Sequence, residues 1–453
     1  MRPVAVPLFR GLRRLFGGGR LLPGLPPIPA APVLEGPMFA AASTPDAVGI
    51  GTRAVGREIV MLVVSDLRVD PRVEREARVL AAAGYSVTVY CPDPTQGQDP
   101  DIKLDWGKNI RISFLHWSAA SFTMHAPGLY ASQLFDKAVT HRPFAFHAHD
   151  LNTAFAARAA ARVTGAHLVV DFHEWFSENV RWNADLREFL PHDAAWKHPM
   201  QELERLCLKE ASEVVTVCDS IADAMALELG EGRRPIVVRN IPNFDAVPTK
   251  SYPSLKAQFD LPESQFVLLY QGGTGPTRLL EPIIESLGVA ERCVLVIRGP
   301  SIDYFERDYR KVAAKVGAAH RLILAGPVPS RDVVAAARGA DAGIYSVLGV
   351  GRNFVYALPN KLFEYMAAHL PILTANYPEA KNIVESNEIG LSFDPLDPGS
   401  IGAAINRLID EPPLRSRFAE NTVRTLRTMD AGREWSKLVQ IYDSLPRSGA
   451  GKA

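Results

Sequence analysis

The strongest constraint on the fold is a repeated alternation of short apolar runs with longer amphipathic segments. The run EIVMLVV at residues 58–64 is continuously apolar after Glu58, as expected for a strand that is buried on both faces. PRVEREARVLAAAG at 71–84 follows, with apolar residues at helical spacing, an early proline and a final glycine. Strands that alternate with helices of this length predict βαβ units and a parallel sheet.

The alternation occurs in two blocks, which predicts two domains. Residues 58–240 form the first block and 263–430 the second, while prolines interrupt the pattern at 241–262, which we interpret as a linker. Residues 431–453 are expected to form a C-terminal helix and tail. We therefore predict an α/β fold of two Rossmann-like, doubly wound domains that face a central cleft. The aromatic, irregular stretch at 173–199 is expected to be a loop at a site.

The N-terminal segment, residues 1–57, differs from the rest of the chain. Its first 34 residues contain five arginines and no acidic residue, and prolines recur after them. Repeated proline sustains neither a helix nor a central strand, so we interpret the segment as a mostly disordered extension. The alternative is a short amphipathic helix in VPLFRGLRRLF, at 6–16, lying on an anionic membrane.

Composition excludes several classes of protein. The 50 basic and 50 acidic residues cancel, so no global positive field is present to hold nucleic acid. The four cysteines are scattered, which argues against a disulfide scaffold or a structural zinc site. No apolar run reaches the length of a transmembrane helix. We expect a cytoplasmic protein, with peripheral contact at the inner face of the membrane as the alternative.

Polar motifs follow several predicted strands, where open parallel sheets bind their ligands. The first strand is followed by SDLRVDPR, which is neither a dinucleotide fingerprint nor a P-loop. HAHD at 147–150 and DFHE at 171–174 end two later strands of the first block. The H-x-H could be a metal site or purely structural, but the second block lacks the further ligands that a metal barrel needs. We treat the DPD at 99–101 as a chance resemblance to a metal-binding motif.

Two motifs of the second block suggest a phosphate site. In YQGGTGPTRLLE, the glycines at 272, 273 and 275 allow close approach of a ligand to the backbone. The plain alternative is that these glycines only form a tight turn. Arg278 is expected at the start of the next helix, where a cation opposes the helix dipole unless an anion is bound.

The segment ALPNKLFEYMAAHLPIL is the most specific feature of the chain. Asn360 and Lys361 open a predicted helix, and Glu364 lies on nearly the same face as Lys361. The plain alternative is a surface ion pair between these two side chains. If the start of this helix faces the cleft, Lys361 would instead contact a diphosphate, and Glu364 would accept hydrogen bonds from the hydroxyls of a ribose.

Together these segments resemble glycosyltransferase family 4, retaining enzymes of the GT-B fold. The resemblance covers about residues 58–445. It rests on the segments SDLRVDPRVEREARVLAAAGYSVTV, FHAHDLNTA, VVDFHEWFSE, VTVCDSIAD, the glycine turn with Arg278 and LPNKLFEYMAAHLPIL. The motif PNKLFEY indicates a branch of that family. The resemblance implies a nucleotide-sugar donor bound mainly by the second domain and an acceptor bound mainly by the first. It implies no metal and no other cofactor.

The resemblance also implies roles for individual residues. The catalytic set is His149, Arg278 and Lys361. The donor-binding set is Gly272, Gly273, Arg278, Val328, Asn360, Lys361 and Glu364. The acceptor-side set is Arg72, His149, Asp150, His173 and Glu174.

Two positions depart from the family pattern. Tyr356 stands where the first glutamate of the family's pair is expected, eight residues before Glu364, and that glutamate normally contacts the donor sugar. Gly273 and Thr274 stand where the family has an arginine after the glycine turn, a loss for which Lys361 is expected to compensate. The identity of the donor is therefore open.

The predicted function is transfer of a sugar from a nucleotide-sugar to a glycan, a lipid-linked or a small-molecule acceptor, with retention of configuration. In the mechanism usually proposed for the family, the departing phosphate takes the acceptor proton, and fixed cations stabilise it. The alternatives are a GT-B nucleotide-sugar epimerase or hydrolase and a non-catalytic scaffold that binds nucleotide-sugars.

Overall fold

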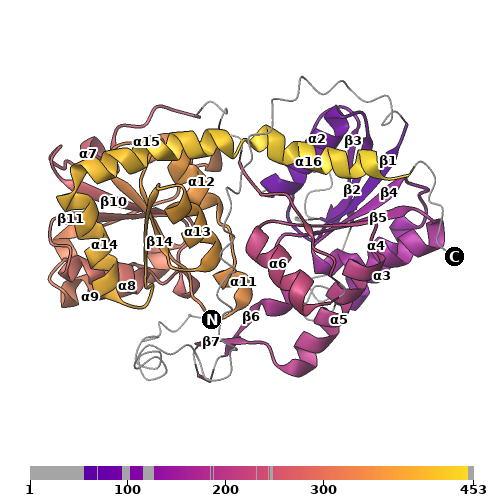
Figure 1. Ribbon diagram of the computed structural model, residues 1–453, viewed down its shortest axis with the longest axis horizontal. Helices are drawn as coiled ribbons and strands as arrows, with labels where there is room; N and C mark the ends of the chain where they lie inside the picture. The colour runs from indigo at the N-terminus through magenta and orange to yellow at the C-terminus, as the bar shows by residue number, and fades with distance from the viewer. Residues whose placement is uncertain are drawn as a thin grey trace.

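A computed structural model describes residues 56–446 except 69, 94–102, 116–126, 184, 187, 231, 243 and 245–247, and it describes only the backbone of 127–132. The basic extension, its membrane contact and the DPD therefore lie outside the described residues, apart from Gly56 and Arg57. Figure 1 shows two α/β halves side by side, each with helices packed around a central sheet. The expected α/β fold of two Rossmann-like halves is confirmed.

The first half contains a seven-stranded sheet whose paired strands are all parallel. In spatial order its strands are β3 (Ile110–Leu115), β2 (Ser86–Pro92), β1 (Glu58–Leu62), β4 (Ala145–His149), β5 (His167–Phe172), β8 (Glu213–Thr216) and β9 (Ile236–Val237). Its helices are α2 (Pro71–Ala82), α3 (Pro127–Ala138), α4 (Leu151–Thr164), α5 (Ala194–Glu210), α6 (Asp219–Glu228) and, from the end of the chain, α16 (Ala431–Ser444).

The second half contains a six-stranded parallel sheet. In spatial order its strands are β12 (Leu322–Ala325), β11 (Cys293–Arg298), β10 (Phe266–Gln271), β13 (Ala342–Tyr345), β14 (Ile372–Ala375) and β15 (Gly390–Phe393). Its helices are α7 (Leu255–Gln258), α8 (Leu280–Glu285), α9 (Ile302–Lys315), α10 (Val333–Ala336), α11 (Arg352–Val355), α12 (Asn360–Ala367), α13 (Pro378–Ser386), α14 (Pro398–Asp410) and α15 (Pro412–Thr428).

Apolar side chains on both faces of each sheet explain why these runs form central strands. In β1, Val60 and Leu62 pack into one apolar cluster, while Ile59 and Met61 pack into the cluster on the opposite face. Each such side chain stabilises the fold by roughly 1.5–3 kcal/mol relative to an exposed position. The strand order reverses between β1 and β4 in the first sheet and between β10 and β13 in the second. Such reversals open a crevice beyond the carboxyl ends of the strands, which positions the site.

The expectation of an irregular loop at 173–199 is wrong. The segment contains a 3₁₀ turn (Phe176–Glu178), an antiparallel hairpin of β6 (Val180–Asn183) and β7 (Glu188–Pro191), and the start of α5. Each strand of the hairpin is only four residues long, too short a run to indicate a strand, and the hairpin packs partly against the other half. Val180 and Phe189 contact an apolar cluster around Leu348.

The connections between the halves are more structured than the sequence indicated. Within the expected linker, α7 already belongs to the second half, because the Leu255 amide donates to the Arg338 carbonyl at 2.6 Å and Lys256 pairs with Asp341. At the other end of the chain, α16 crosses back and lies along α2 of the first half (Figure 1).

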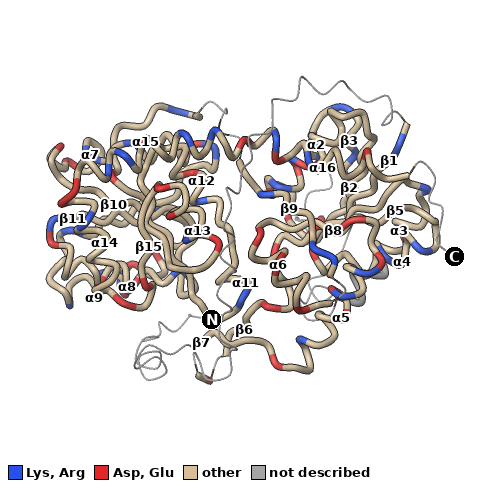
Figure 2. The backbone as a smooth tube through the Cα atoms, viewed as in Figure 1, with Lys and Arg blue, Asp and Glu red and all other residues tan. Residues whose placement is uncertain are grey.

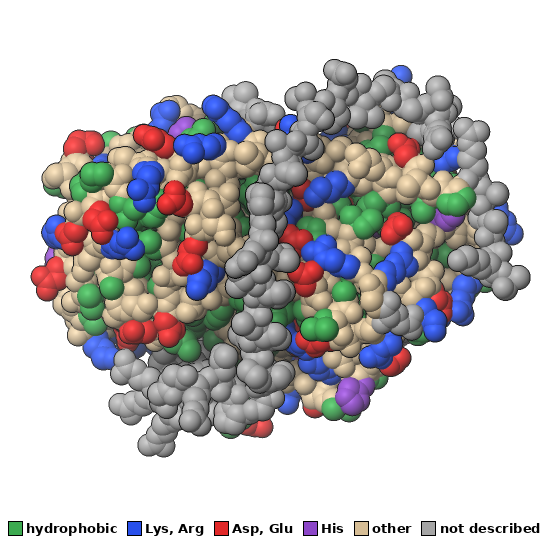
Figure 3. Space-filling view, in the orientation of Figure 1, with side chains coloured by type: hydrophobic (Ala, Val, Ile, Leu, Met, Phe, Trp, Pro, Cys, Tyr) green, Lys and Arg blue, Asp and Glu red, His purple; other side chains and the backbone are tan. Residues whose placement is uncertain are grey.

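Charges of both signs are interspersed over both halves of the backbone, as Figure 2 shows. The described side chains on the face in Figure 3 are similarly mixed, without a large region of one sign. None of the helices within the described residues has both the length and the apolar composition needed to cross a bilayer.

Candidate active site

A cavity of about 460 Å³ lies at the carboxyl ends of the strands of the second sheet. It brings together most of the residues expected to bind a donor, which are Gly272, Val328, Asn360, Lys361 and Glu364. Two further cavities, of about 430 and 230 Å³, share lining residues with it, so the three form one concave region. Gly273 and Arg278, the remaining members of the expected set, do not line the central cavity.

Lys361 is the central cation of this cavity. Its ammonium nitrogen lies 5.6 Å from the ring centre of Tyr270 and 6.0 Å from that of Tyr345. Gly272 has a φ of +128°, which favours glycine, and a Cβ there would lie 2.4 Å from Lys361 Cε and would displace the end of that side chain. Among the described residues no carboxylate forms an ion pair with this ammonium. Burial, with the nearby charge of Arg278, lowers the pKa of Lys361 to about 8.

Glu364 and Arg278 both act on the charge of Lys361 from a distance, because the carboxylate favours the ammonium and the guanidinium opposes it. Glu364 lines the same cavity one turn along α12, and burial raises its pKa above the ordinary value. The surface ion pair between Lys361 and Glu364 is not formed in the described structure. Arg278 ends a 3₁₀ turn and is separated from α8 by Leu279, whose φ is +46°. The expectation that Arg278 lies in the first turn of a helix is therefore wrong, although its charge reaches Lys361.

Two lining residues escaped the sequence analysis. The Gln271 side chain is buried, and within the described structure neither its amide oxygen nor its nitrogen has a hydrogen-bond partner. Arg298, also buried, donates to the Ala336 carbonyl at 2.6 Å and to Gln258 at 3.2 Å, and among the described residues it has no carboxylate partner. The sequence could have indicated both residues, because each is a polar residue at the end of an apolar strand. Unpartnered buried polar groups are costly, which favours a polar ligand here.

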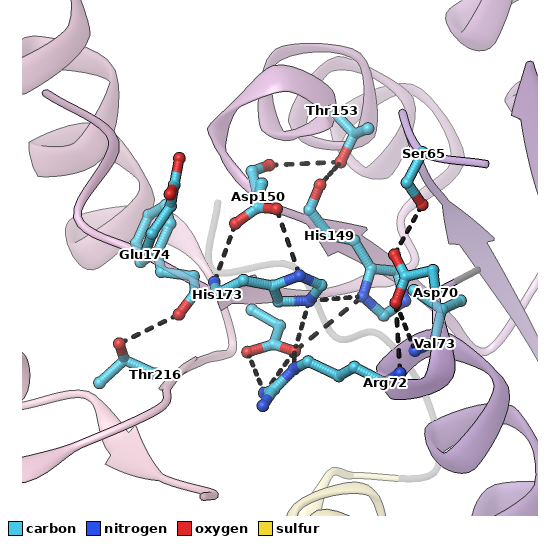
Figure 4. A network of polar contacts seen from close by, with 12 residues as sticks. Ser65, Asp70, Arg72, Val73, His149, Asp150, Thr153, His173, Glu174 and Thr216 are labelled. Carbon is cyan, nitrogen blue, oxygen red and sulfur yellow. Dashed lines mark hydrogen bonds and ion pairs between the residues drawn. The ribbon is translucent and has the colours of Figure 1, made fainter. Parts of the chain in front are cut away.

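The first half presents a histidine–carboxylate network, drawn in Figure 4, at the ends of β4 and β5. His173 lies between two carboxylates, with Nδ1 3.2 Å from Asp150 and Nε2 3.2 Å from Asp171. His173 Nε2 also lies 3.1 Å from His149 Nδ1. Arg72 donates to both oxygens of Asp171 at 2.8 Å. We name these five side chains the histidine network.

The backbone that presents the histidine network is strained at one position. Asp150 has a φ of +61°, uncommon for a residue other than glycine. Its amide donates to the Asp171 carbonyl at 2.8 Å, and its carboxylate accepts from the His173 amide at 2.8 Å. These bonds hold the turn between β4 and α4 in place. Strain of this kind concentrates at functional sites.

Burial and charge set the protonation states of the histidine network. Burial opposes the charge of His173, but the carboxylates of Asp150 and Asp171 raise its pKa to about 9. Burial keeps the pKa of His149 well below the ordinary value. Burial would raise the pKa of Asp171, but the Arg72 guanidinium holds it well below the usual range. Burial, with the charge of Asp171, raises the pKa of Glu76 well above the ordinary value.

The expected acceptor-side residues divide into three groups. His149, Asp150 and His173 come together at the strand ends. Arg72 is only 3% exposed and is committed to Asp171, so the expectation that it contacts an acceptor is corrected to a supporting position beneath the histidines. Glu174 instead accepts from Asn179 at 2.6 Å and from Asn353 of the second half at 3.0 Å.

Among the described residues, one group of side chains could hold a metal ion, and it lies in the same region. Ligand atoms of Glu76, His149, Asp171 and His173 lie within 4.8 Å of one another. Asp171 already pairs with Arg72, whose Nε lies 2.9 Å from Glu76, and the two histidines bond to each other. Because a guanidinium already neutralises the carboxylates, the cluster fits a hydrogen-bond network better than a cation site.

Tyr356 packs between the two halves. It is 8% exposed, its ring is stacked on Trp175 with centroids 6.4 Å apart, and its carbonyl accepts from the Cys218 thiol. Next to it, Arg352 pairs with Glu178 at 2.8 Å and with Glu228. The position expected to carry a donor-contacting glutamate thus contributes to contact between the halves.

Two α/β halves with parallel sheets, packed side by side, are the GT-B architecture. Residues 69–243 match the family model of a glycosyl transferase 4-like domain, and residues 252–425 match that of glycosyl transferases group 1. The chain therefore belongs to the GT-B glycosyltransferases that combine these two domains.

Similar proteins agree with this assignment. A D-inositol 3-phosphate glycosyltransferase from Thermomonospora curvata is 24% identical over 211 residues, which is 43% of this chain and 48% of that relative. The match thus spans about half the length of the relative. A sucrose-phosphate synthase from Thermosynechococcus elongatus superposes with a TM-score of 0.69 at 14% identity, covering 85% of this chain and 98% of the other. Anabaena HepE in complex with UDP superposes with a TM-score of 0.64 at 13% identity, covering 86% of this chain and all of HepE.

Proposed function

We propose that this glycosyltransferase uses a nucleoside-diphosphate sugar as donor and a glycan, a lipid-linked or a small-molecule acceptor, with retention of anomeric configuration and without a metal ion. The observation that carries the proposal is the Lys361 ammonium, which lies in a donor-sized cavity without a carboxylate partner in the described structure. A desolvated cation in such a place favours an anionic ligand. The solved complex of HepE with UDP supports the same ligand class for this chain.

In the proposed mechanism the diphosphate lies against Lys361 and the first turn of α12, with Arg278 close by. Helix N-termini and fixed cations stabilise the negative charge that develops on the departing phosphate. Glu364 accepts hydrogen bonds from the ribose, and the base extends toward Val328. The departing phosphate takes the proton of the acceptor hydroxyl as the new glycosidic bond forms on the same face. No protein nucleophile is required in this scheme.

Substituting Glu364 tests the orientation of the donor. Glu364→Ala is expected to weaken binding of the free nucleoside and of the nucleoside diphosphate by a similar factor, about 10–100-fold, because its partner is the ribose. Titration calorimetry with uridine, guanosine and their diphosphates measures both. Arg278→Ala is the matched comparison, since it is expected to weaken the diphosphate alone. Loss of diphosphate binding with unchanged nucleoside binding in Glu364→Ala would contradict the proposed orientation.

Substituting His149 tests whether the second half alone binds the donor while the first half contributes to turnover. His149→Ala is expected to leave donor affinity nearly unchanged and to lower turnover, because His149 lies in the half opposite the donor cavity. Isothermal titration of the nucleoside diphosphate and steady-state kinetics separate the two effects. Activity that depends on added divalent metal and disappears with chelator would instead overturn the metal-free scheme.

A non-catalytic scaffold is the second candidate, and Tyr356 is the observation that favours it. The position lacks a carboxylate and is committed to packing on Trp175. Donor binding detected by thermal shift, with no sugar transferred to any acceptor and no free sugar released, supports the scaffold. Release of free sugar without an acceptor identifies a hydrolase.

A further inference from the structure

We infer that His173 is a positioning residue, an imidazolium that fixes His149 in the tautomer that carries its proton on Nε2. His149 then presents a hydrogen-bond donor to the substrate and cannot act as a general base. The inference rests on the proposed function only in assigning the substrate as the partner of that donor.

The first step concerns the two ring nitrogens of His173. A carboxylate oxygen lies 3.2 Å from each of them, Asp150 Oδ2 at Nδ1 and Asp171 Oδ2 at Nε2. Ionised carboxylates only accept hydrogen bonds, so each nitrogen must carry a proton to make a favourable contact. Arg72 keeps Asp171 ionised through its contacts with both oxygens. His173 is therefore doubly protonated, in agreement with its pKa of about 9.

The second step concerns His149. Its Nδ1 lies 3.1 Å from His173 Nε2, which already carries a proton, so Nδ1 must be the acceptor. The nearest oxygen of Asp171 is 4.0 Å from Nδ1, too far for a hydrogen bond. His149 is buried and its ring is stacked on His147 with centroids 4.3 Å apart, an environment that keeps it neutral. The one remaining proton of a neutral imidazole is then on Nε2.

The third step concerns what Nε2 contacts. His149 is 2% exposed, and its Nε2 has no hydrogen-bond partner in the described structure. A buried donor without a partner is unfavourable by itself, which fits a group that is completed by an oxygen of the bound substrate. A hydroxyl or ring oxygen of the transferred sugar, or the acceptor hydroxyl, would accept this hydrogen bond. The same tautomer prevents His149 from removing a proton from the acceptor.

The charged groups around His173 come from four elements. Arg72 and Glu76 face it from α2, His147 and His149 from β4, Asp150 from the start of α4, and Asp171 from β5. Above pH 9, His173 loses a proton, and the Nε2 lone pair then faces the Asp171 carboxylate. His149 relieves this by donating from Nδ1 to His173, which moves its proton away from Nε2. Activity is therefore expected to fall as pH rises through about 9.

Nuclear magnetic resonance tests the tautomer without any activity assay. In full-length protein labelled with ¹⁵N-histidine at pH 7, we expect His149 to show a bare Nδ1 and a protonated Nε2. We expect His173 to show two protonated nitrogens. Spectra of His149→Gln and His173→Gln assign the signals. A protonated Nδ1 on His149, or one bare nitrogen on His173, overturns the inference.

The pH profile gives the second measurement. Asp150→Asn removes one carboxylate from His173 and is expected to move the alkaline limb of kcat down by about 1–2 pH units. The limb is measured at saturating donor, where bound diphosphate keeps Lys361 charged. Asp223→Asn is the matched control, because Asp223 is exposed on α6 and pairs with Arg234, and its limb should stay in place. An unmoved limb in Asp150→Asn contradicts the positioning role. If the tautomer is as expected while His149→Ala retains full turnover, the proposed function of His149 fails and the tautomer assignment stands.

Discussion

Replacing Lys361 by alanine is expected to lower affinity for the nucleoside diphosphate by roughly 1.5–3 kcal/mol, as a lost charged hydrogen bond. The loss in kcat should be larger, roughly 10²–10³-fold, because the ammonium faces charge that develops mainly in the transition state. Calorimetric titration and steady-state kinetics measure the two losses separately. Lys381→Ala is the matched control, since Lys381 lies on the outside of α13 in the same half.

The pH dependence of donor binding gives an independent signature of Lys361. The pKa of Lys361 is lowered to about 8 in the unliganded protein. The amine loses its charge as pH rises above this value, so diphosphate affinity should fall between about pH 8 and 10. Bound diphosphate favours the ammonium, so binding near pH 8 takes up a proton, which the buffer dependence of the binding enthalpy measures. If Lys361→Ala binds diphosphate as tightly as the unsubstituted protein, the phosphate site lies elsewhere.

Replacing Arg72 by methionine is expected to reduce the free energy of unfolding by about 3–5 kcal/mol, the usual cost of leaving one partner of a buried ion pair alone. Asp171 and Glu76 then lose their guanidinium, and both carboxylates are buried. Because the pKa of Asp171 is depressed in the fold, its stabilising contribution is present at neutral pH and is lost only under acidic conditions, below the ordinary carboxyl pKa. Urea denaturation followed by circular dichroism measures the change.

Arg310→Ala is the matched control for Arg72. Arg310 forms an exposed i,i+4 pair with Glu306 on α9, which is worth less than about 0.5 kcal/mol. The double variant Arg72→Met with Asp171→Leu should recover part of the lost stability, because no unpaired charge remains at that pair. A single variant as stable as the parent would show that the carboxylates are neutralised in another way.

The sequence predicted those strands and helices that are determined by the composition and length of their own segment. Continuous apolar runs such as those of β1 and β10 are buried on both faces, so their strand character follows from composition and length alone. The cavity residues after β10 and in the first turn of α12 were also predictable, because strand ends in parallel sheets meet at one edge. Neither inference needs any knowledge of how the two halves pack.

Long-range partners could not be predicted in the same way. The pair of Arg72 and Asp171 joins residues 99 positions apart, and nothing in the local pattern of α2 distinguishes Arg72 from an exposed arginine. In the sequence, Gln271 is simply the polar residue that ends a strand. Whether its side-chain amide has a hydrogen-bond partner depends on the neighbouring strands, whose positions the local sequence does not give. Tyr356 packs on Trp175, which belongs to the other half of the chain, so the local sequence around Tyr356 could not predict this contact.

The return of α16 to the first half has a consequence for the synthesis of the protein. Trp435, Leu438, Ile441 and Tyr442 belong to the same apolar cluster as Ile59 and Met61 of β1. The Tyr442 hydroxyl also bonds to His147 at 2.7 Å, beside His149. The ribosome releases these residues only after the whole second domain. The first domain therefore completes its core only after the second domain has been synthesised, and the second domain can fold as a unit before that.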